Sequence, residues 1–193
     1  DEAVVVTTAS YDHTSVVQQL GLAAAECLLR GLQGREIVNL TWGTAILAVV
    51  DALPRQNWRE LTVVQMLGGL GSPEADVHAT DLTRRAAQSL GAKPRLLSAP
   101  GIVSSKLVRD ALLADRQISD TLALAAKADA ALVGLGRPTP SSVVVQSGIL
   151  SEKELDQLHQ LGAVGDIGLR FFDADGQAIQ HEICDRIIGL DLI

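Results

Sequence analysis

The sequence predicts an α/β fold of three layers, in which helices cover both faces of a mainly parallel β-sheet. Short apolar runs typical of buried strands alternate along the chain with amphipathic helical patterns. This alternation requires helical crossovers, which build parallel sheets that are covered on both faces. A length of 193 residues suits one large domain, and a hydrophobic fraction of 47% is sufficient to fill its core.

In the first half of the chain, apolar periodicity and helix-breaking residues define three helices and two strands. The first apolar stripe, with a 3.6-residue spacing, follows a cap candidate at Thr14 and Ser15. Pro54 ends the second helix, because a residue before proline disfavours the helical region, and Gly91 ends the third. The helices are expected at residues 14–32, 44–53 and 74–90, and the strands at residues 36–42 and 61–67.

In the second half, strands and helices continue to alternate as far as a C-terminal hairpin. Ser151 and Glu154 have the spacing of a capping box at the start of a helix. Asp175 and Gly176 are the expected turn of the hairpin. The strands are expected at residues 94–100 and 129–136, the helices at 104–128, with a break near 115–119, and at 151–160, and the hairpin at 165–179.

The charge and the cysteine content restrict the partners and the compartment. A net charge of -7 argues against direct binding to a nucleic-acid backbone or to an anionic membrane surface. No apolar run approaches the ~18–20 residues of a membrane span. Two cysteines, Cys27 and Cys184, are too few for the disulfide framework of a secreted domain, so we expect a reduced, cytoplasmic protein.

The sequence lacks the motifs of common cofactor and catalytic sites. It contains neither a GxGxxG nor a GxxxxGK[ST] phosphate loop, and no serine stands in a GxSxG elbow. The histidines lack the spacing of a metal site; they are His13, His78, His159 and His181. We therefore expect neither a metal nor a cofactor.

Glycine-containing loops follow four of the predicted strands. In parallel sheets ligands bind beyond the carboxyl ends of the strands, and glycine lets the backbone approach them closely. Gly43 and Thr44 also open a helix, where free amides favour an anion or a polar oxygen. The loops therefore predict a ligand site, although each glycine could serve only to make a tight turn. They are Trp42-Gly43-Thr44, Gly68-Gly69-Leu70-Gly71, Ala99-Pro100-Gly101 and Gly134-Leu135-Gly136.

Three polar residues near these loops could contact a ligand or could have structural roles alone. His78 opens the helix after the Gly68-Gly69 loop and could face a ligand or solvent. Arg137 could reach a phosphate or remain in an exposed loop. Asp166, which lies among glycines, could accept hydrogen bonds from hydroxyl groups or cap a turn.

Six segments of the chain together carry a resemblance to a known family. In order, they are LTWGTA, VVQMLGGLG, LLSAPGIV, ADAALVGLG, GAVGDIGLRFFDADG and RIIGL. They resemble the sugar-binding effector domain of SorC-family (SorC/DeoR-type) bacterial transcription regulators over nearly the whole chain. The resemblance implies a Rossmann-like domain, similar to the glucosamine-6-phosphate deaminase, ribose-5-phosphate isomerase and CoA-transferase-like fold. It also implies a sugar, polyol or phosphosugar effector that controls a DNA-binding homo-oligomer, either a dimer or a tetramer.

The resemblance also assigns roles to individual residues. Gly43, Thr44 and Ala45 match a loop that cradles a phosphate, although Ala45 stands where the family often has a second hydroxyl. Leu67 stands where some members carry a Lys or Arg that contacts or captures the effector, so no Schiff base is expected there. His78 matches a polar contact.

The remaining matches place the other end of the effector. Asp166 matches an acidic residue that binds sugar hydroxyls, and Arg137 falls in a loop near the far end of the ligand. The full implied effector-binding set is Trp42, Gly43, Thr44, Ala45, Leu67, Gly68, Gly69, His78, Pro100, Gly134, Gly136, Arg137 and Asp166.

Two features of the family are missing from the sequence. It has no N-terminal helix-turn-helix, and the family's final segment, with a Lys near the effector phosphate, does not follow Ile193. We therefore expect residues 1–193 to be a sugar-binding effector domain without its C-terminal segment. Contact with DNA would then require a helix-turn-helix outside this chain.

Two other functions compete with that of a sensor. The chain could be a sugar-phosphate isomerase or deaminase in which Asp166 and His78 supply acid–base chemistry. It could also be a structural or dimerisation domain that binds no ligand. We favour the sensor, because the family resemblance makes these two residues binding residues.

Overall fold

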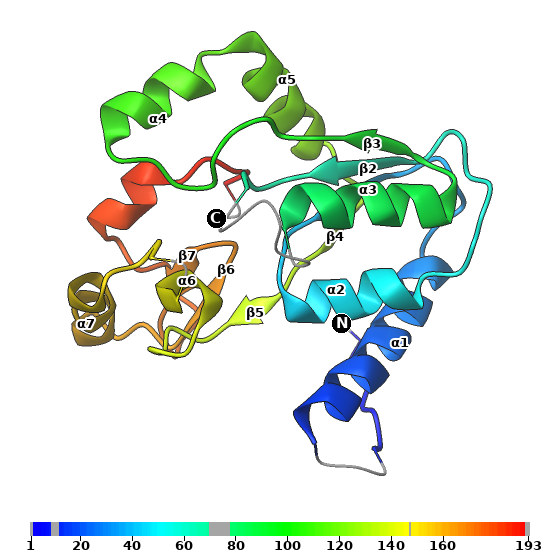
Figure 1. Ribbon diagram of the computed structural model, residues 1–193, viewed down its shortest axis with the longest axis horizontal. Helices are drawn as coiled ribbons and strands as arrows, with labels where there is room; N and C mark the ends of the chain where they lie inside the picture. The colour runs from blue at the N-terminus through cyan, green and yellow to red at the C-terminus, as the bar shows by residue number, and fades with distance from the viewer. Residues whose placement is uncertain (1, 9–11, 70–77, 147, 192–193) are drawn as a thin grey trace.

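The computed structural model describes residues 2–8, 12–69, 78–146 and 148–191, whose helices and strands are shown in Figure 1. The first half contains α1 (His13–Arg30), β1 (Ile37–Leu40), α2 (Thr44–Ala52), β2 (Thr62–Gln65), α3 (Ala79–Leu90) and β3 (Lys93–Arg95). The second half contains α4 (Lys106–Leu113), α5 (Arg116–Ala125), β4 (Ala130–Leu132), β5 (Leu135–Gly136), α6 (Val143–Gln146), α7 (Glu152–Gln160), β6 (Gly165–Ile167), β7 (Arg170–Phe172) and a 3₁₀ helix, η1 (Glu182–Arg186).

A parallel sheet of four strands in the order β3-β2-β1-β4 forms the centre of the first region. Val38 of β1 lies opposite Val63 of β2 on one side and Ala130 of β4 on the other. Every pairing in this sheet is parallel, which confirms the predicted sheet. The carboxyl ends of all four strands therefore lie at the same edge of the sheet, as predicted for the glycine-containing loops that follow them.

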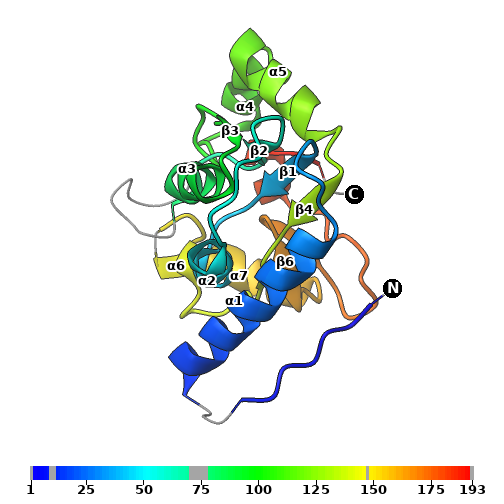
Figure 2. The ribbon, with the colours of Figure 1, turned by 90° about the vertical axis from the view of Figure 1, so that its right-hand side faces the viewer.

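Helices cover both faces of the parallel sheet because side chains alternate along each strand. Val38, Leu40 and Val63 face one hydrophobic cluster, which α1, α2 and α3 complete (Figure 2). Val64 faces the opposite cluster, to which α5 contributes Ala125. On that second face the Asn39 amide donates to the Ala125 carbonyl at 2.9 Å. The predicted three-layer arrangement is confirmed.

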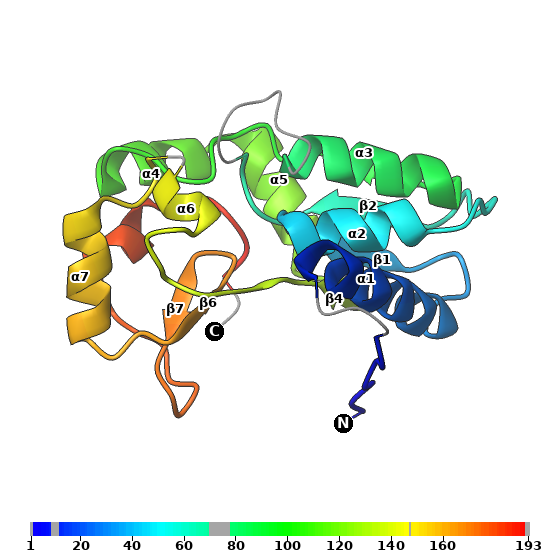
Figure 3. The ribbon, with the colours of Figure 1, turned by 60° about the horizontal axis from the view of Figure 1, so that its bottom comes forward.

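A second region contains an antiparallel sheet of three strands in the order β5-β6-β7, of which the sequence predicted only the hairpin within residues 165–179. Its own hydrophobic core includes residues of α7, β7 and η1, among them Leu158, Phe171 and Ile183. Figure 3 shows this region beside the parallel sheet, with the chain passing from one to the other through β4 and β5. The ligand loops after β1 and β4 therefore face the second region.

Several element boundaries differ from the predictions. The strand predicted at 129–136 is two short strands, because the chain leaves the parallel sheet after Leu132 and pairs again at Leu135. The strand predicted at 94–100 is limited to β3, and the break predicted near 115–119 lies between α4 and α5. The helix predicted at 74–90 begins at Ala79, and residues 74–77 lie outside the described part of the chain.

The C-terminal hairpin reverses earlier than predicted. Gly168 and Leu169 connect β6 to β7, and their φ angles of 57° and 67° are those of a two-residue type I′ turn. The predicted turn at Asp175 and Gly176 also exists, but it joins Phe172 to Ala178 in a later antiparallel bridge.

The capping box predicted at the start of the helix at 151–160 is confirmed. In the capping box of α7, the Ser151 hydroxyl accepts from the Glu154 amide and the Glu154 carboxylate accepts from the Ser151 amide. Helices α1 and α2 cross in close contact, since a Cβ atom at Gly21 would lie 2.6 Å from the Ala48 backbone. Within the described residues, no helix combines the length and the apolar character needed to cross a bilayer.

Candidate functional site

A pocket of about 380 Å³ lies where the carboxyl ends of β1 and β4 meet the antiparallel sheet. Eight of the thirteen residues predicted for the site line it, and they come from both regions of the molecule. They are Trp42, Gly43, Thr44, Ala45, Gly134, Gly136, Arg137 and Asp166. The pocket is therefore bounded by the parallel sheet on one side and by β5 and β6 on the other.

A larger groove of about 500 Å³ lies between α1 and α2 and shares His13 and Thr44 with the pocket. Its lining combines apolar residues such as Val17 and Leu47 with polar ones such as Gln18 and Asp51. The smaller pocket is the better candidate because it lies beyond the carboxyl ends of parallel strands, where ligands bind in such sheets.

The first wall of the pocket is built from the end of β1 and the start of α2. The Thr41 amide donates to the Leu132 carbonyl at 3.2 Å, and the Thr41 hydroxyl accepts from the Gly134 amide at 3.4 Å. These bonds hold the ends of β1 and β4 together. Gly43 then turns the chain with φ 119° and ψ 169°, a conformation available almost only to glycine.

The amino end of α2 supplies donors to the pocket. No side chain caps this helix, so the amides of its first turn have no intrahelical or side-chain partner. Thr44 and Ala45, the first two residues of the helix, both line the pocket. Backbone amides and the Thr44 hydroxyl at a helix start suit a phosphate or an uncharged oxygen.

Two further polar atoms at this pocket are buried without a partner. Trp42 Nε1 and Ser142 Oγ have no hydrogen-bond partner among the described residues, and both side chains line the pocket. Buried polar groups are normally paired, and an indole N–H can only donate. These two atoms lie behind the pocket surface, so they do not themselves face a ligand in this structure.

Asp166 forms the acidic wall opposite. It is 8% exposed, and its Oδ2 accepts from the Leu169 amide at 3.1 Å. A Cβ atom at position 136 would overlap Asp166 Oδ1, so the glycine at Gly136 makes the space that this oxygen occupies. Burial raises the pKa of Asp166, and the hydrogen bond from Leu169 opposes that rise.

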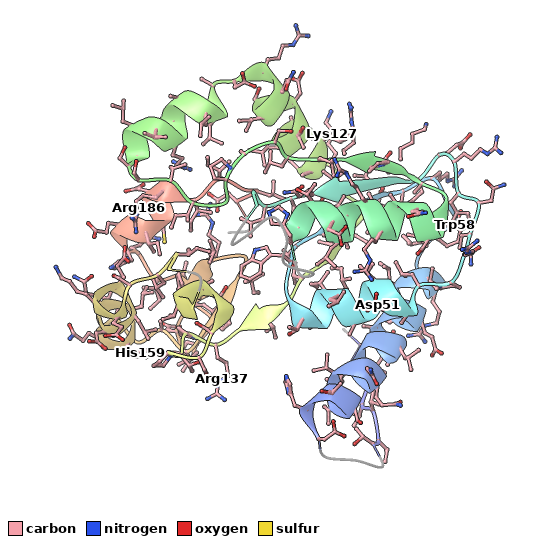
Figure 4. The ribbon with its side chains drawn as sticks, in the orientation of Figure 1. Asp51, Trp58, Lys127, Arg137, His159 and Arg186 are labelled. Atoms are coloured by element: carbon pink, nitrogen blue, oxygen red, sulfur yellow. The ribbon has the colours of Figure 1, made fainter. Side chains whose placement is uncertain are left out.

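Arg137 marks the mouth of the pocket. Its side chain is exposed and projects away from the ribbon in Figure 4. It forms no ion pair with any residue that the structure describes, so its charge is available to an anion. The nearby hydroxyls of Thr139 and Ser141 lie 3.2 Å apart.

Five predicted site residues lie elsewhere, at the ends of β2 and β3. The Gly68 amide donates to the Ile188 carbonyl at 2.9 Å, and Gly69 exchanges hydrogen bonds with Ala99 and Gly101. The five are Leu67, Gly68, Gly69, His78 and Pro100, and none of them lines this pocket. Their contact with an effector remains a prediction, since the adjacent residues 70–77 lie outside the described part of the chain.

His78 has a structural role that the sequence did not specify. It is the N-cap of α3, and its Nδ1 accepts from the Thr80 amide at 3.4 Å. Its ring lies against Gly69, where a Cβ atom would come within 2.8 Å of Nε2. Since Asp166 lines the pocket and His78 does not, the acid–base pair expected of an isomerase is not assembled there.

Sequence reasoning missed several residues of the pocket. The hydroxyl-bearing ones are Thr41, Thr139, Ser141 and Ser142, and His13 reaches the pocket from the start of α1. The run PTPSS after the Gly134–Arg137 loop was a usable signal, because hydroxyl groups recur there directly after a strand end. No comparable signal indicated His13.

Comparisons with known proteins agree on one family. The Sugar-bind family of sugar-binding domains matches residues 1–193. The deoxyribonucleoside regulator of Bacillus subtilis is 27% identical over 191 residues, covering 99% of this chain and 61% of the regulator. The sorbitol operon regulator of Klebsiella pneumoniae is 26% identical over 193 residues, with the same two coverages of 99% and 61%.

Comparison of the fold with a solved structure supports the same family. The crystal structure of the full-length sorbitol operon regulator SorC from Klebsiella pneumoniae superposes with a TM-score of 0.89 at 26% identity. The match covers 98% of this chain and 61% of that one. The chain thus spans about three fifths of the length of the regulators it resembles.

Proposed function

The chain belongs to the Sugar-bind family of sugar-binding domains, and from this premise we propose that it senses a small sugar, polyol or phosphosugar for a bacterial transcription regulator of carbohydrate metabolism. The proposal follows from the polar groups of the pocket and from the regulators that the chain resembles.

Asp166 is the observation that carries this proposal. Its carboxylate is 8% exposed, and it forms no ion pair with the described residues. A buried carboxylate of this kind costs free energy unless hydrogen-bond donors satisfy it. The hydroxyl groups of a sugar or polyol are such donors, and they are neutral.

The opposite wall offers complementary groups. The α2 amides donate, and they suit the hydroxyl, ring or phosphate oxygens of the same ligand. Arg137 follows Gly136, which pairs with Asp166, so it belongs to the Asp166 side of the pocket. We therefore orient the effector with hydroxyl groups toward Asp166 and with an oxygen-rich or phosphorylated end toward Thr44 and the α2 amides.

The pocket's position explains how binding could reach the rest of the regulator. A ligand that touches both α2 and β6 bridges the two regions of the domain. It would stabilise the arrangement in which they fit it best and shift the population accordingly. We propose that contact with DNA occurs through a helix-turn-helix outside this chain, in a cytoplasmic homo-oligomer, either a dimer or a tetramer.

The enzyme interpretation has less support. The family and the relatives are regulatory domains, and His78 caps α3 instead of lining the pocket with Asp166. The particular acid–base partner that the enzyme interpretation assigned to Asp166 is therefore absent from the pocket.

A thermal-shift screen tests the proposal. The panel contains sorbitol, 2-deoxyribose and a deoxyribonucleoside, with terminally phosphorylated forms of the first two. A ligand at one hundred times its Kd adds about 2.7 kcal/mol, which corresponds to roughly 5–10 °C for a domain of this size. We expect a selective shift by at least one compound of this class.

The Asp166→Asn variant is the matched control for the screen. A shift that the variant reduces places the ligand in this pocket. A shift of equal size in both proteins would contradict the site, and the absence of any shift across a wider panel of sugars would contradict the sensor function.

A further inference from the structure

The turn between β6 and β7 contains the only described residue other than glycine with a positive φ angle. Leu169 has φ 67°, in the left-handed region, and Gly168 before it has φ 57°. Type I′ turns require this conformation at both central residues, and glycine or asparagine normally occupies them. A leucine in this region is strained by contact between its Cβ and the backbone.

The leucine side chain explains why the strained turn persists. Leu169 is 0% exposed and packs into the core of the second region with Leu155, Phe171 and Ile183. A strained backbone conformation is retained only where its surroundings fix it more strongly than the strain opposes it. Burial of this side chain provides that restraint.

The backbone amide of the same residue contacts Asp166, which lines the pocket. It donates to Asp166 Oδ2 at 3.1 Å, while Asp166 Oδ1 lies over Gly136 at the pocket wall. One oxygen of the carboxylate is thus held by the turn, and the other remains for a ligand. The side chain and the amide of one residue join the core of the second region to the site.

We propose that Leu169 is a positioning residue for the effector site: its buried side chain holds the left-handed turn that fixes the orientation of the Asp166 carboxylate. The role in binding rests on the proposed function of the pocket, whereas the orientation of the carboxylate can be measured without a ligand. Leu169 does not line the pocket itself, and it acts only through Asp166.

Three variants separate positioning from simple packing. Leu169→Gly and Leu169→Ala both leave a cavity in the core, but glycine accepts the left-handed conformation and alanine does not. Leu155→Ala removes a comparable side chain from the same core without touching the turn. We expect the turn to persist in Leu169→Gly and in Leu155→Ala, and to relax in Leu169→Ala.

The readout is the NMR titration of the Asp166 carboxyl carbon in each ligand-free protein. Loss of the Leu169 amide as a donor removes stabilisation of the charged form, so the pKa of Asp166 should rise in Leu169→Ala. It should remain at the wild-type pKa in Leu169→Gly and Leu155→Ala. Equal titrations in Leu169→Ala and Leu169→Gly would overturn the proposal.

A wild-type measurement covers the case in which a variant does not fold. The amide resonance of Leu169 should shift with pH at the midpoint of Asp166, and this titration should vanish in Asp166→Asn. A Leu169 amide that does not respond to the Asp166 titration would also overturn the proposal.

Binding then distinguishes this inference from the function on which it rests. With sorbitol, 2-deoxyribose or their phosphates as probes, Leu169→Ala should weaken binding by about tenfold, the contribution of one hydrogen bond to a charged group. Leu169→Gly and Leu155→Ala should bind the same probe like the wild type. If Asp166→Asn binds the probe as tightly as the wild type, the proposed function fails. If Asp166→Asn weakens binding but Leu169→Ala and Leu169→Gly bind the probe with equal affinity, only the positioning role fails.

Discussion

Two pairs of strand ends in the same parallel sheet carry similar glycine-containing loops, yet only one pair borders the pocket. The open strand ends are residues 42–45 after β1 and residues 134–136 after β4. The closed strand ends are residues 67–69 after β2 and residues 99–101 after β3. The difference lies in what packs against each pair from elsewhere in the chain.

At the closed strand ends, glycine lets backbone meet backbone. The segment 186–190 begins at the end of η1 and hydrogen-bonds to both loops, with Ile188 accepting from Gly68 and donating to Gly101. At the open strand ends, glycine makes room for a side chain from the other sheet, since Gly136 lies under Asp166. A glycine after a strand therefore indicates close approach, and the approaching group decides whether a ligand site results.

Gly68→Ala should give the largest effect, and it should be an effect on stability. A Cβ atom there would overlap the Pro100 carbonyl, and both backbones are fixed by hydrogen bonds. Overpacking of this kind costs about 3 kcal/mol, or roughly 10 °C in the melting temperature. Thermal unfolding measured by circular dichroism checks this expectation.

The matched control is Gly134→Ala at the open strand ends. A Cβ atom at this position meets its nearest neighbour, the Trp42 carbonyl oxygen, at 3.9 Å, which is ordinary contact. We expect little change in stability. Equal destabilisation by the two substitutions would remove the distinction between the two pairs of strand ends.

Gly136→Ala should give the next largest effect, on binding instead of stability. The added methyl group would displace Asp166 Oδ1 from its position at the pocket wall. Loss of a hydrogen-bonded charged contact costs about 1.5–3 kcal/mol, so affinity should fall by at least tenfold and up to about a hundredfold. Calorimetric titration with the best compound of the screen measures this loss, and wild-type affinity would contradict the position of the site.

Asp166→Asn should lower affinity by about tenfold, since asparagine keeps one acceptor oxygen but loses the charge. The same substitution should stabilise the ligand-free protein at pH 7, although it weakens binding. Burial raises the folded-state pKa of Asp166 above 3.8, so the stability it contributes is present below that value and is lost as pH rises through the raised pKa. The variant should therefore melt higher than the wild type at pH 7, and the difference should disappear below pH 3.8.

Glu154 provides a control of opposite sign for that experiment. Burial would raise its pKa, but hydrogen bonds from Ser151 and the charge of Arg186 outweigh burial and lower it. Its contribution to stability is present above the ordinary pKa and is lost as pH falls through the lowered one. Glu154→Gln should therefore melt lower than the wild type at pH 7. A higher melting temperature would contradict the opposite effects expected for Glu154 and Asp166.

Thr44→Val should give the smallest effect. It removes one neutral hydroxyl at the start of α2 and leaves the helix amides in place. A neutral hydrogen bond contributes about 0.5–1.5 kcal/mol, so affinity should fall by roughly two- to tenfold with an unchanged melting temperature of the free protein. Unchanged binding of the best compound would remove Thr44 from the effector contacts.

The sequence was sufficient for the local features of the fold. The parallel sheet, the helices over its faces, the α7 capping box and the glycine-containing loops after β1 and β4 all follow from periodicity, capping residues and glycine placement within short windows. These features depend on neighbours in the chain, which is the information that a single sequence carries.

Long-range packing accounts for most of the errors. Nothing local to Gly68 indicates that residues 186–190 will cover it, since more than a hundred positions separate them. The apolar run 129–136 is continuous in sequence, and only pairing with β1 and then with β6 divides it into two strands. The hydroxyl groups of residues 139–142 reach the pocket for the same reason, through the position of the second region.

The chain contains two tryptophans, and their positions suit an optical experiment. Trp42 lies at the pocket, in contact with the cores of both regions, whereas Trp58 precedes β2 at the opposite edge of the sheet (Figure 4). An indole responds to its surroundings by changes in emission intensity and wavelength, so occupancy of the pocket should alter the fluorescence of Trp42 directly. A Trp58→Phe protein would leave Trp42 as the only tryptophan, and this variant would then report ligand binding without an added dye.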